Sequence, residues 1–282
     1  MYKMIAIDLD GTLLNDEKEI SEENRKWIYK AYNEHGVIPV ITTGRNVSSI
    51  EYFTKLLGSD MVEYVIAQNG AIIKDIIKNE YISFDAIPDE TVKKAISILK
   101  SNNIMASLET DMYVISDSQK TEEVMELYAK LGDNIKIVED LKAYDTRNDR
   151  ISIVTGEGEA EELESVIGKL EELEELLVVP ISKYLAQNGD FVYERYYIEA
   201  TAKGVSKGNA IIVLAEHLGI KEEEIIVMGD GANDISMFEI GVLKVAMGNG
   251  AEILKEKADY VTTSNNGSGV AKAIQKYIFG IV

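Results

Sequence analysis

The stretch "MIAIDLDGT", residues 4 to 12, decides the fold because it predicts a buried strand that ends in two carboxylates. Its first four residues are apolar without alternation, which is typical of a strand covered on both faces of a parallel sheet. Asp8 and Asp10 follow, with one leucine between them. Because ligands of open α/β sheets bind beyond the carboxyl ends of the strands, this pair marks a candidate site.

Two other interpretations compete with a reaction centre at this pair. A calcium loop of the EF-hand type requires glycine at its sixth position, where this chain has Leu13. An ordinary turn is also compatible with Asp-Gly, which is common in turns. Two acids at the end of a buried strand are costly unless a cation joins them, however, and the context therefore favours a site.

Composition limits the function classes. The 282 residues, 46% of them hydrophobic, are enough for one large domain or two ordinary ones. A formal charge of −20 argues against nucleic acid or an anionic membrane as the main partner. The absence of cysteine excludes disulfides and thiolate chemistry. No apolar stretch approaches the roughly 18 residues of a membrane span, so we expect a cytoplasmic protein with no membrane partner.

The pattern of strands and helices divides the chain into two parts. Strands alternate with helices in residues 1–83 and again in 200–282, which predicts an α/β domain with a doubly wound, Rossmann-like parallel sheet. Pro39 is awkward in the second of these strands because proline removes a ladder donor. In residues 84–199 the strands come in neighbouring pairs, including a hairpin around Asn188-Gly189, and we expect an inserted α+β domain.

An acidic helix around residues 157–175 belongs to this insertion. Its glutamates could suggest a cation site, but a solvated helix face is the better interpretation. The residues that we expect on its buried face are Leu163, Val166, Ile167, Leu170 and Leu173.

Further polar residues stand where the other strands end or where a helix begins. These residues are Thr43, Gly44, Lys203, Lys207, Asp230, Asn233 and Asp234. A hydroxyl and free amides at a helix N-terminus suit a phosphate oxygen. Several carboxylates, with few at any one strand end, favour Mg²⁺, which retains water ligands. Each residue alone has an ordinary structural explanation, but together they indicate a site for an anionic ligand and a cation.

These segments resemble a known family. "DLDGT", the threonine of "TTGR", Lys207 of "KGVSKG" and "GDGANDISM" look like the four motifs of the haloacid dehalogenase superfamily, in order. The insertion, "QNGA" at 68–71 and "AMGNG" near residue 246 are similar to its Cof-type branch, subclass IIB. The resemblance implies a catalytic core of residues 1–83 and 200–282 with a cap domain, a substrate-specificity lid, at 84–199. It also implies a Mg²⁺-dependent phosphatase acting on small phosphorylated metabolites, such as sugar or cofactor phosphates.

The resemblance also implies roles for individual residues. Asp8 would be the nucleophile that forms an aspartyl-phosphate, and Asp10 would protonate the leaving group and then activate water. Asp8, Asp10 (through its main-chain carbonyl) and Asp230 would hold Mg²⁺, with Asp234 behind them. The groups that would bind the phosphoryl oxygens are Thr43, Gly44, Lys207 and Asn233. Lys207 is preferred to Lys203 because Gly208 and a helix follow it directly, as in the family motif.

Three alternatives stay open at this point. A phosphosugar mutase of the same superfamily would return the phosphoryl group to a second hydroxyl. "GVSKG" at 204–208 matches the G-x-S-x-G pattern of serine hydrolases, with Ser206 as nucleophile and His217 as the one histidine after it. A binding module without turnover is the third. The sequence specifies neither the substrate nor the oligomeric state.

Overall fold

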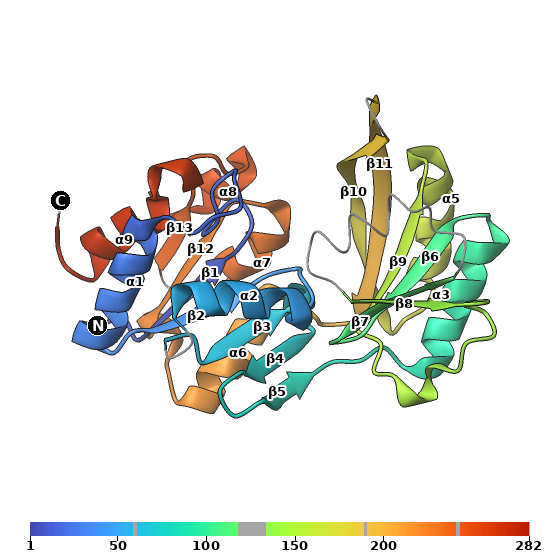
Figure 1. Ribbon diagram of the computed structural model, residues 1–282, viewed down its shortest axis with the longest axis horizontal. Helices are drawn as coiled ribbons and strands as arrows, with labels where there is room; N and C mark the ends of the chain where they lie inside the picture. The colour runs from blue at the N-terminus through green and yellow to red at the C-terminus, as the bar shows by residue number, and fades with distance from the viewer. Residues whose placement is uncertain (59–60, 118–133, 189–190, 241–242, 282) are drawn as a thin grey trace. The chain divides into compact units, whose positions relative to one another are not determined.

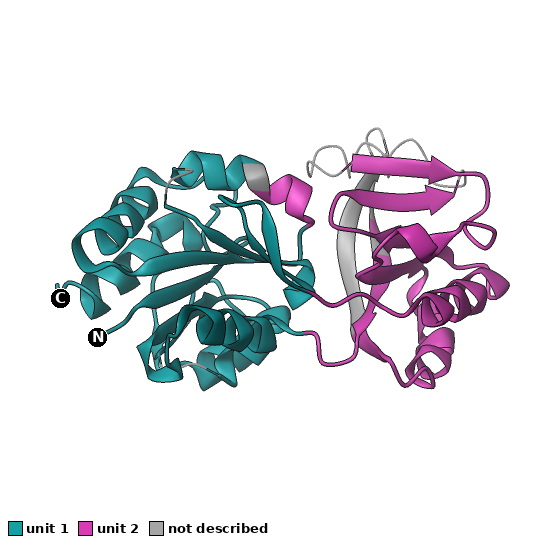
Figure 2. Cartoon of the chain, turned by 90° about the horizontal axis from the view of Figure 1, so that it is seen from below, with its two compact units in different colours: residues 1–45, 51–83, 206–282 teal, residues 46–50, 84–205 magenta. Residues whose placement is uncertain are grey.

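The computed structural model describes residues 1–58, 61–117, 134–188, 191–240 and 243–281. They form two compact units (Figure 2). The first unit comprises residues 1–45, 51–83 and 206–282, and the second comprises 46–50 and 84–205. The second unit extends past residue 199, the boundary expected from the sequence, because strand β11 (Phe191–Ala202) continues beyond it. No helix in the described part of the chain is long and apolar enough to cross a membrane.

The first unit is built on an eight-stranded sheet (Figure 1). In spatial order its strands are β14 (Tyr260–Val261), β13 (Leu243–Ala246), β12 (Ile225–Gly229), β1 (Met4–Asp8), β2 (Ile38–Thr42), β3 (Tyr64–Ala67), β4 (Ile72–Asp75) and β5 (Glu80–Phe84). Neighbours from β14 to β3 pair in parallel, whereas β4 is antiparallel to β3. The predicted parallel sheet is confirmed.

Strand β1 is buried along its whole length, as its unbroken apolar run predicts. Pro39 is tolerated in β2 for a local reason. Ile38 donates its N–H to Lys3 on the β1 side, so the nitrogen of Pro39 faces β3. Pairing with β3 begins only at Val40, and no ladder bond is lost.

Helices cover both faces of this sheet (Figure 1). They are α1 (Glu22–His35), α2 (Val47–Leu57), α6 (Lys207–Leu218), α7 (Ile235–Phe238), α8 (Glu252–Lys257) and α9 (Gly269–Tyr277). Met4 and Ala6 of β1 pack with residues of α6 and α7 in one core, and the alternate residues Ile5 and Ile7 point to the other face. Ser21 caps α1 at its start, and Gly36, in the left-handed conformation, ends it.

The strand order fixes where a ligand can bind. From β1 the chain winds outward through β2 and β3, whereas from β12 it winds the opposite way through β13 and β14. Since such crossovers are right-handed, the two halves carry their connecting helices on opposite faces. The boundary between β1 and β12 is therefore the switch point, and the loops after Asp8 and Gly229 diverge there.

The second unit contains a six-stranded sheet. In spatial order its strands are β10 (Leu176–Asn188), β11, β9 (Ile153–Gly158), β6 (Met105–Glu109), β7 (Tyr113–Asp117) and β8 (Asn134–Val138). The predicted hairpins are confirmed, since β6 pairs antiparallel with β7 and β10 with β11. Asn188 pairs with Phe191, and the turn residue Gly189 lies outside the described residues.

Two helices, α3 (Asp89–Ser101) and α5 (Ala160–Glu171), share an apolar core with this sheet. On α5, Leu163, Val166 and Leu170 are buried, while Ile167 and Leu173 pack partly buried against the same cluster. Most of the glutamates are exposed. The amphipathic interpretation of this acidic helix is confirmed.

Glu199 of β11 introduces a titratable group into this unit. Its neighbours Ile198 and Ala200 belong to the helix-covered core, so its own side chain lies on the other face of the sheet. There it is half-buried and opposite Thr155 of β9. Burial raises the pKa of Glu199 from 4.5 to about 7.

This shift predicts a pH-dependent stability. Because the pKa of Glu199 is raised in the folded state, its contribution to the free energy of unfolding is fully present below pH 4.5 and is lost as the pH rises through about 7. Glu199→Gln cannot ionise, so it does not lose this stability. The free energy of unfolding of the variant, relative to that of the wild type, should therefore rise by up to about 3 kcal/mol between pH 4.5 and pH 8. Urea unfolding followed by circular dichroism measures it. Glu164→Gln, at an exposed position of α5, is the control, and an equal pH profile for Glu199→Gln and wild type would contradict the prediction.

Candidate active site

A buried lysine joins two of the predicted carboxylates. Lys207, the first residue of α6, is 1% exposed, and its Nζ lies 2.6 Å from Asp8 Oδ1 and 2.7 Å from Asp234 Oδ1. Lys203, the other candidate, is exposed. Burial lowers the pKa of Lys207, but the two carboxylates outweigh burial and hold the pKa above its ordinary value. The ammonium therefore stays charged inside the protein.

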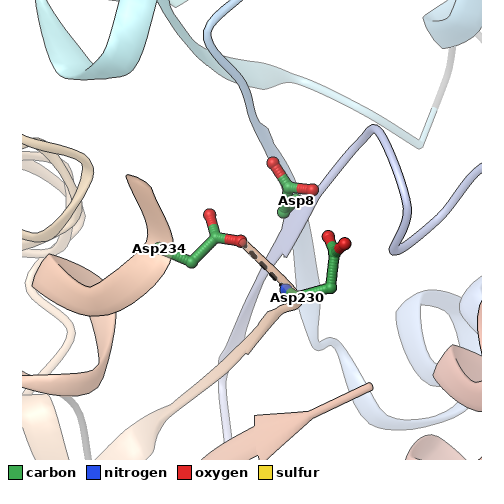
Figure 3. A group of neighbouring side chains, drawn as sticks. All are labelled: Asp8, Asp230 and Asp234. Carbon is green, nitrogen blue, oxygen red and sulfur yellow. Dashed lines mark hydrogen bonds between the residues drawn. The ribbon is translucent and has the colours of Figure 1, made fainter. Parts of the chain in front are cut away.

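Asp230 completes a cluster of three carboxylates with Asp8 and Asp234 (Figure 3). One oxygen of each lies within 4.8 Å of the others. Asp234 accepts the main-chain N–H groups of Asp230 and Gly231 on Oδ2, both at 2.9 Å, which closes the loop after β12. With Lys207 on its Oδ1, Asp234 has hydrogen bonds on both oxygens and acts as a support for the other two acids.

The loop after β1 reaches the same cluster. Thr12 Oγ1 donates to Asp230 Oδ1 at 2.9 Å. Gly11 adopts a φ of +80°, and a Cβ at this position would lie 2.3 Å from Asp230 Oδ2. Glycine is therefore required here by both the backbone conformation and the close approach of Asp230.

The charge of this cluster fits a divalent cation. Burial, followed by the neighbouring Asp234, raises the pKa of Asp8 well above its ordinary value against the opposing effect of Lys207. Burial also raises the pKa of Asp230. When all three acids are ionised, the single ammonium leaves a formal charge of −2. Oxygen donors with this charge suit Mg²⁺, and the residues present fit the predicted metal.

Asp10 lies in a different environment, and its carboxylate is not part of the cluster. Arg45 donates two hydrogen bonds to this carboxylate, from Nε to Oδ2 at 2.6 Å and from Nη2 to Oδ1 at 2.8 Å. Lys18 adds a third at 2.9 Å. Burial raises the pKa of Asp10, but the bonds from Arg45 and Lys18 outweigh it and hold the pKa at about 2. The carboxylate of Asp10 is thus held ionised beside the cluster.

The predicted phosphate-binding residues come from the neighbouring loops. Thr43 follows β2 directly and is buried, and its Oγ1 accepts the N–H of Arg45 at 3.1 Å, which leaves the hydroxyl proton to be donated. Gly44 lies beside Asn69, whose Oδ1 also accepts from Asn233 Nδ2 at 3.4 Å. Asn69 thus touches both Gly44 and Asn233.

Several residues at this edge carried no predicted role. They are Thr12, Lys18, Arg45, Asn69 and Asn249. The last belongs to "AMGNG", and its Nδ2 donates to the carbonyl of Gly11 at 2.8 Å. All except Lys18 lie inside the motifs that resemble the family, so the sequence could have indicated them as site residues. Only the folded chain shows which groups they contact.

The serine-hydrolase alternative fails on helix geometry. Ser206 is the N-cap of α6 and accepts the N–H of Asn209 on its Oγ. His217 lies in the last turn of the same helix and is exposed. At 1.5 Å per residue the two are roughly 16 Å apart, too far for a hydrogen bond.

Comparisons with known proteins identify the family. A family model described as haloacid dehalogenase-like hydrolase matches residues 5–274. A relative from Bacillus subtilis (strain 168), 5-amino-6-(5-phospho-D-ribitylamino)uracil phosphatase YcsE, is 32% identical over 98% of this chain and 96% of its own length.

Solved structures show the same likeness. The HAD subclass IIB sugar phosphatase BT4131 superposes with a TM-score of 0.80 at 29% identity, covering 99% of this chain and all of its own. TM0651 from Thermotoga maritima has a TM-score of 0.80 at 30% identity, covering 98% and 97%. With the family model spanning nearly the whole chain, this protein belongs to the haloacid dehalogenase-like hydrolases.

Proposed function

We propose that this hydrolase is a Mg²⁺-dependent phosphatase that cleaves small phosphate monoesters through an aspartyl-phosphate on Asp8. The observation that carries the proposal is the buried Lys207 ammonium bonded to Asp8 inside a cluster of carboxylates. A carboxylate that attacks a phosphate dianion meets charge repulsion, and a fixed positive charge at the nucleophile reduces it.

In the first step, an Asp8 oxygen attacks phosphorus and the bond to the ester oxygen breaks. Asp10 gives its proton to the departing alkoxide. In the second step, water attacks the aspartyl-phosphate, Asp10 takes the proton from that water, and Asp8 and inorganic phosphate are released. The covalent intermediate divides one difficult displacement into two easier ones.

Asp8, Asp230 and the main-chain carbonyl of Asp10 would hold the metal, which when bound neutralises charge on the phosphoryl group. Lys207 screens the same charge from inside the protein, and Asp234 keeps Lys207 in place. The hydroxyl of Thr43, the amide of Gly44 and the carboxamide of Asn233 would donate to the phosphoryl oxygens.

The second step needs Asp10 ionised, and it is ionised in this structure. The first step needs the opposite protonation state. The bidentate pair with Arg45 must open before Asp10 carries a proton to the leaving group.

The second unit would act as the cap that contacts the substrate beyond its phosphate. Most of the second unit, residues 84–205, is inserted in the sequence between the loop of Thr43 and the helix of Lys207. A separate domain can set specificity without changing the residues that react. The sugar phosphatase and the ribitylaminouracil phosphatase among the relatives make sugar and cofactor phosphates the first substrates to test.

A screen of phosphorylated metabolites for release of inorganic phosphate tests the proposal. We expect turnover with Mg²⁺, its loss in EDTA, and a fall of about 10³-fold or more in Asp8→Asn, which lacks the nucleophile. Asp140→Asn, an exposed acid of the second unit, is the control and should keep wild-type turnover.

Absence of metal-dependent turnover across a broad panel would rule the proposal out. Isomerisation of a sugar phosphate faster than phosphate release would instead identify a mutase.

A second prediction separates the two acids of "DLDGT". Asp8→Asn cannot form the covalent intermediate, whereas Asp10→Asn keeps the nucleophile but lacks the group that transfers protons. Asp10→Asn should therefore form the aspartyl-phosphate slowly or accumulate it. Acid quench followed by intact-protein mass spectrometry detects the phosphorylated form. Wild-type turnover in Asp10→Asn would show that another group transfers the proton.

A further inference from the structure

Three consecutive residues after β3 adopt positive φ angles. They are Gln68 at 49°, Asn69 at 55° and Gly70 at 108°, which together form the short 3₁₀ turn η1 (Gln68–Gly70). Side chains disfavour this region, and asparagine tolerates it better than glutamine does. Gln68 adopts it although it is fully buried. Strained backbone of this kind persists only where its surroundings fix it, and it gathers at functional sites.

The main chain of this turn holds the loop that carries Thr43 and Gly44. The N–H of Asn69 donates to the carbonyl of Thr43, and the N–H of Gln68 donates to the carbonyl of Arg45, both at 3.0 Å. Two successive amides therefore bind the carbonyls on either side of Gly44. The orientation of the Gly44 peptide depends on these two bonds.

The same turn packs against the start of α6. A Cβ on Gly70 would lie 2.3 Å from the carbonyl oxygen of Ser206 and 3.0 Å from the nitrogen of Lys207. This close approach explains why glycine occupies the third position. The turn thus contacts the helix start that carries the buried lysine.

The side chain of Asn69 reaches the third segment of the site. Its Oδ1 accepts from Asn233 Nδ2 at 3.4 Å, and the same oxygen lies 3.0 Å from the place where Gly44 would carry a Cβ. Asn233 itself is exposed, and among the described residues its side chain hydrogen-bonds to Asn69.

We propose that Asn69 is a positioning residue, which holds the Asn233 carboxamide and the Gly44 amide in the orientation that binds the phosphoryl group. This inference rests on the proposed phosphatase function. Asn69 acts through groups that contact the phosphoryl oxygens, and its left-handed backbone is what directs its carboxamide between them.

Asn79 provides a contrast within the same unit. It also has a positive φ, 57°, but it is exposed in the turn between β4 and β5. There the left-handed backbone serves only the turn, because asparagine favours such positions. Asn79 is therefore the matched control for changes at Asn69.

The test compares Asn69→Gly with Asn79→Gly, using p-nitrophenyl phosphate as substrate and inorganic phosphate as competitive inhibitor. Glycine keeps the left-handed backbone at no steric cost and removes only the carboxamide. We expect Asn69→Gly to lower kcat/KM by about 10-fold to 100-fold, the size of effect seen when a group that orients a metal ligand is removed. The inhibition constant of phosphate should rise, with the Tm unchanged. Asn79→Gly should match the wild type.

A double mutant tests whether Asn69 acts through Asn233. If Asn69 acts partly through Asn233, then Asn69→Gly should cost less in an Asn233→Ala background than in the wild type. Wild-type kcat/KM and phosphate inhibition in Asn69→Gly would overturn the inference and leave the proposed function intact.

A structural measurement tests the positioning role even if the protein shows no turnover. If the wild type hydrolyses no phosphate ester, the proposed function fails, and crystal structures of wild type and Asn69→Gly then decide the positioning role. A displaced Asn233 side chain in the variant supports it, and an unchanged position overturns it.

Discussion

The ion pair that Lys207 forms with Asp8 and Asp234 is the constraint on which the rest of the site depends. A buried ammonium is costly unless carboxylates meet it, and the two acids stand 199 and 27 residues away along the chain. The pair can therefore form only when β1, α6 and the loop after β12 come together. The insertion of residues 84–205 does not prevent this, because the entropy cost of closing a long loop grows only slowly with its length.

The strand order explains why this meeting occurs at one edge of the sheet. Asp8 ends β1 and Asp230 directly follows β12, and these neighbours lie on either side of the switch point. Runs of apolar residues predict each strand and its polar end, because that information is local. The sequence patterns alone do not state which strands are neighbours. The expectation that these ends share one site came from the polar residues at several strand ends taken together, and the resemblance to one family supported it.

Other features were beyond prediction because they depend on burial and tertiary contacts. The family motif selected Lys207 rather than Lys203, but its burial and its contacts with Asp8 and Asp234 appear only in the folded chain. Asn69 and Asn249 lie within quoted motifs, but their contacts are with segments remote in sequence. The amphipathic face of α5 and the hairpins were predictable for the opposite reason, since their signals lie within a few residues.

Asp8 and Asp10 show how the pKa values of two acids on one strand end can be shifted in opposite directions. Burial raises the pKa of Asp8, whereas Arg45 and Lys18 overcome burial at Asp10 and hold its pKa at about 2. The first step of the proposed reaction needs an ionised Asp8 and a protonated Asp10. A cation at the carboxylate cluster favours the ionised form of Asp8, and an opened Arg45 pair permits a proton on Asp10. The opening of the Arg45 pair must accompany ligand binding, and since a ligand shifts an equilibrium only by its differential affinity, part of the binding energy of the substrate is used to allow a proton on Asp10.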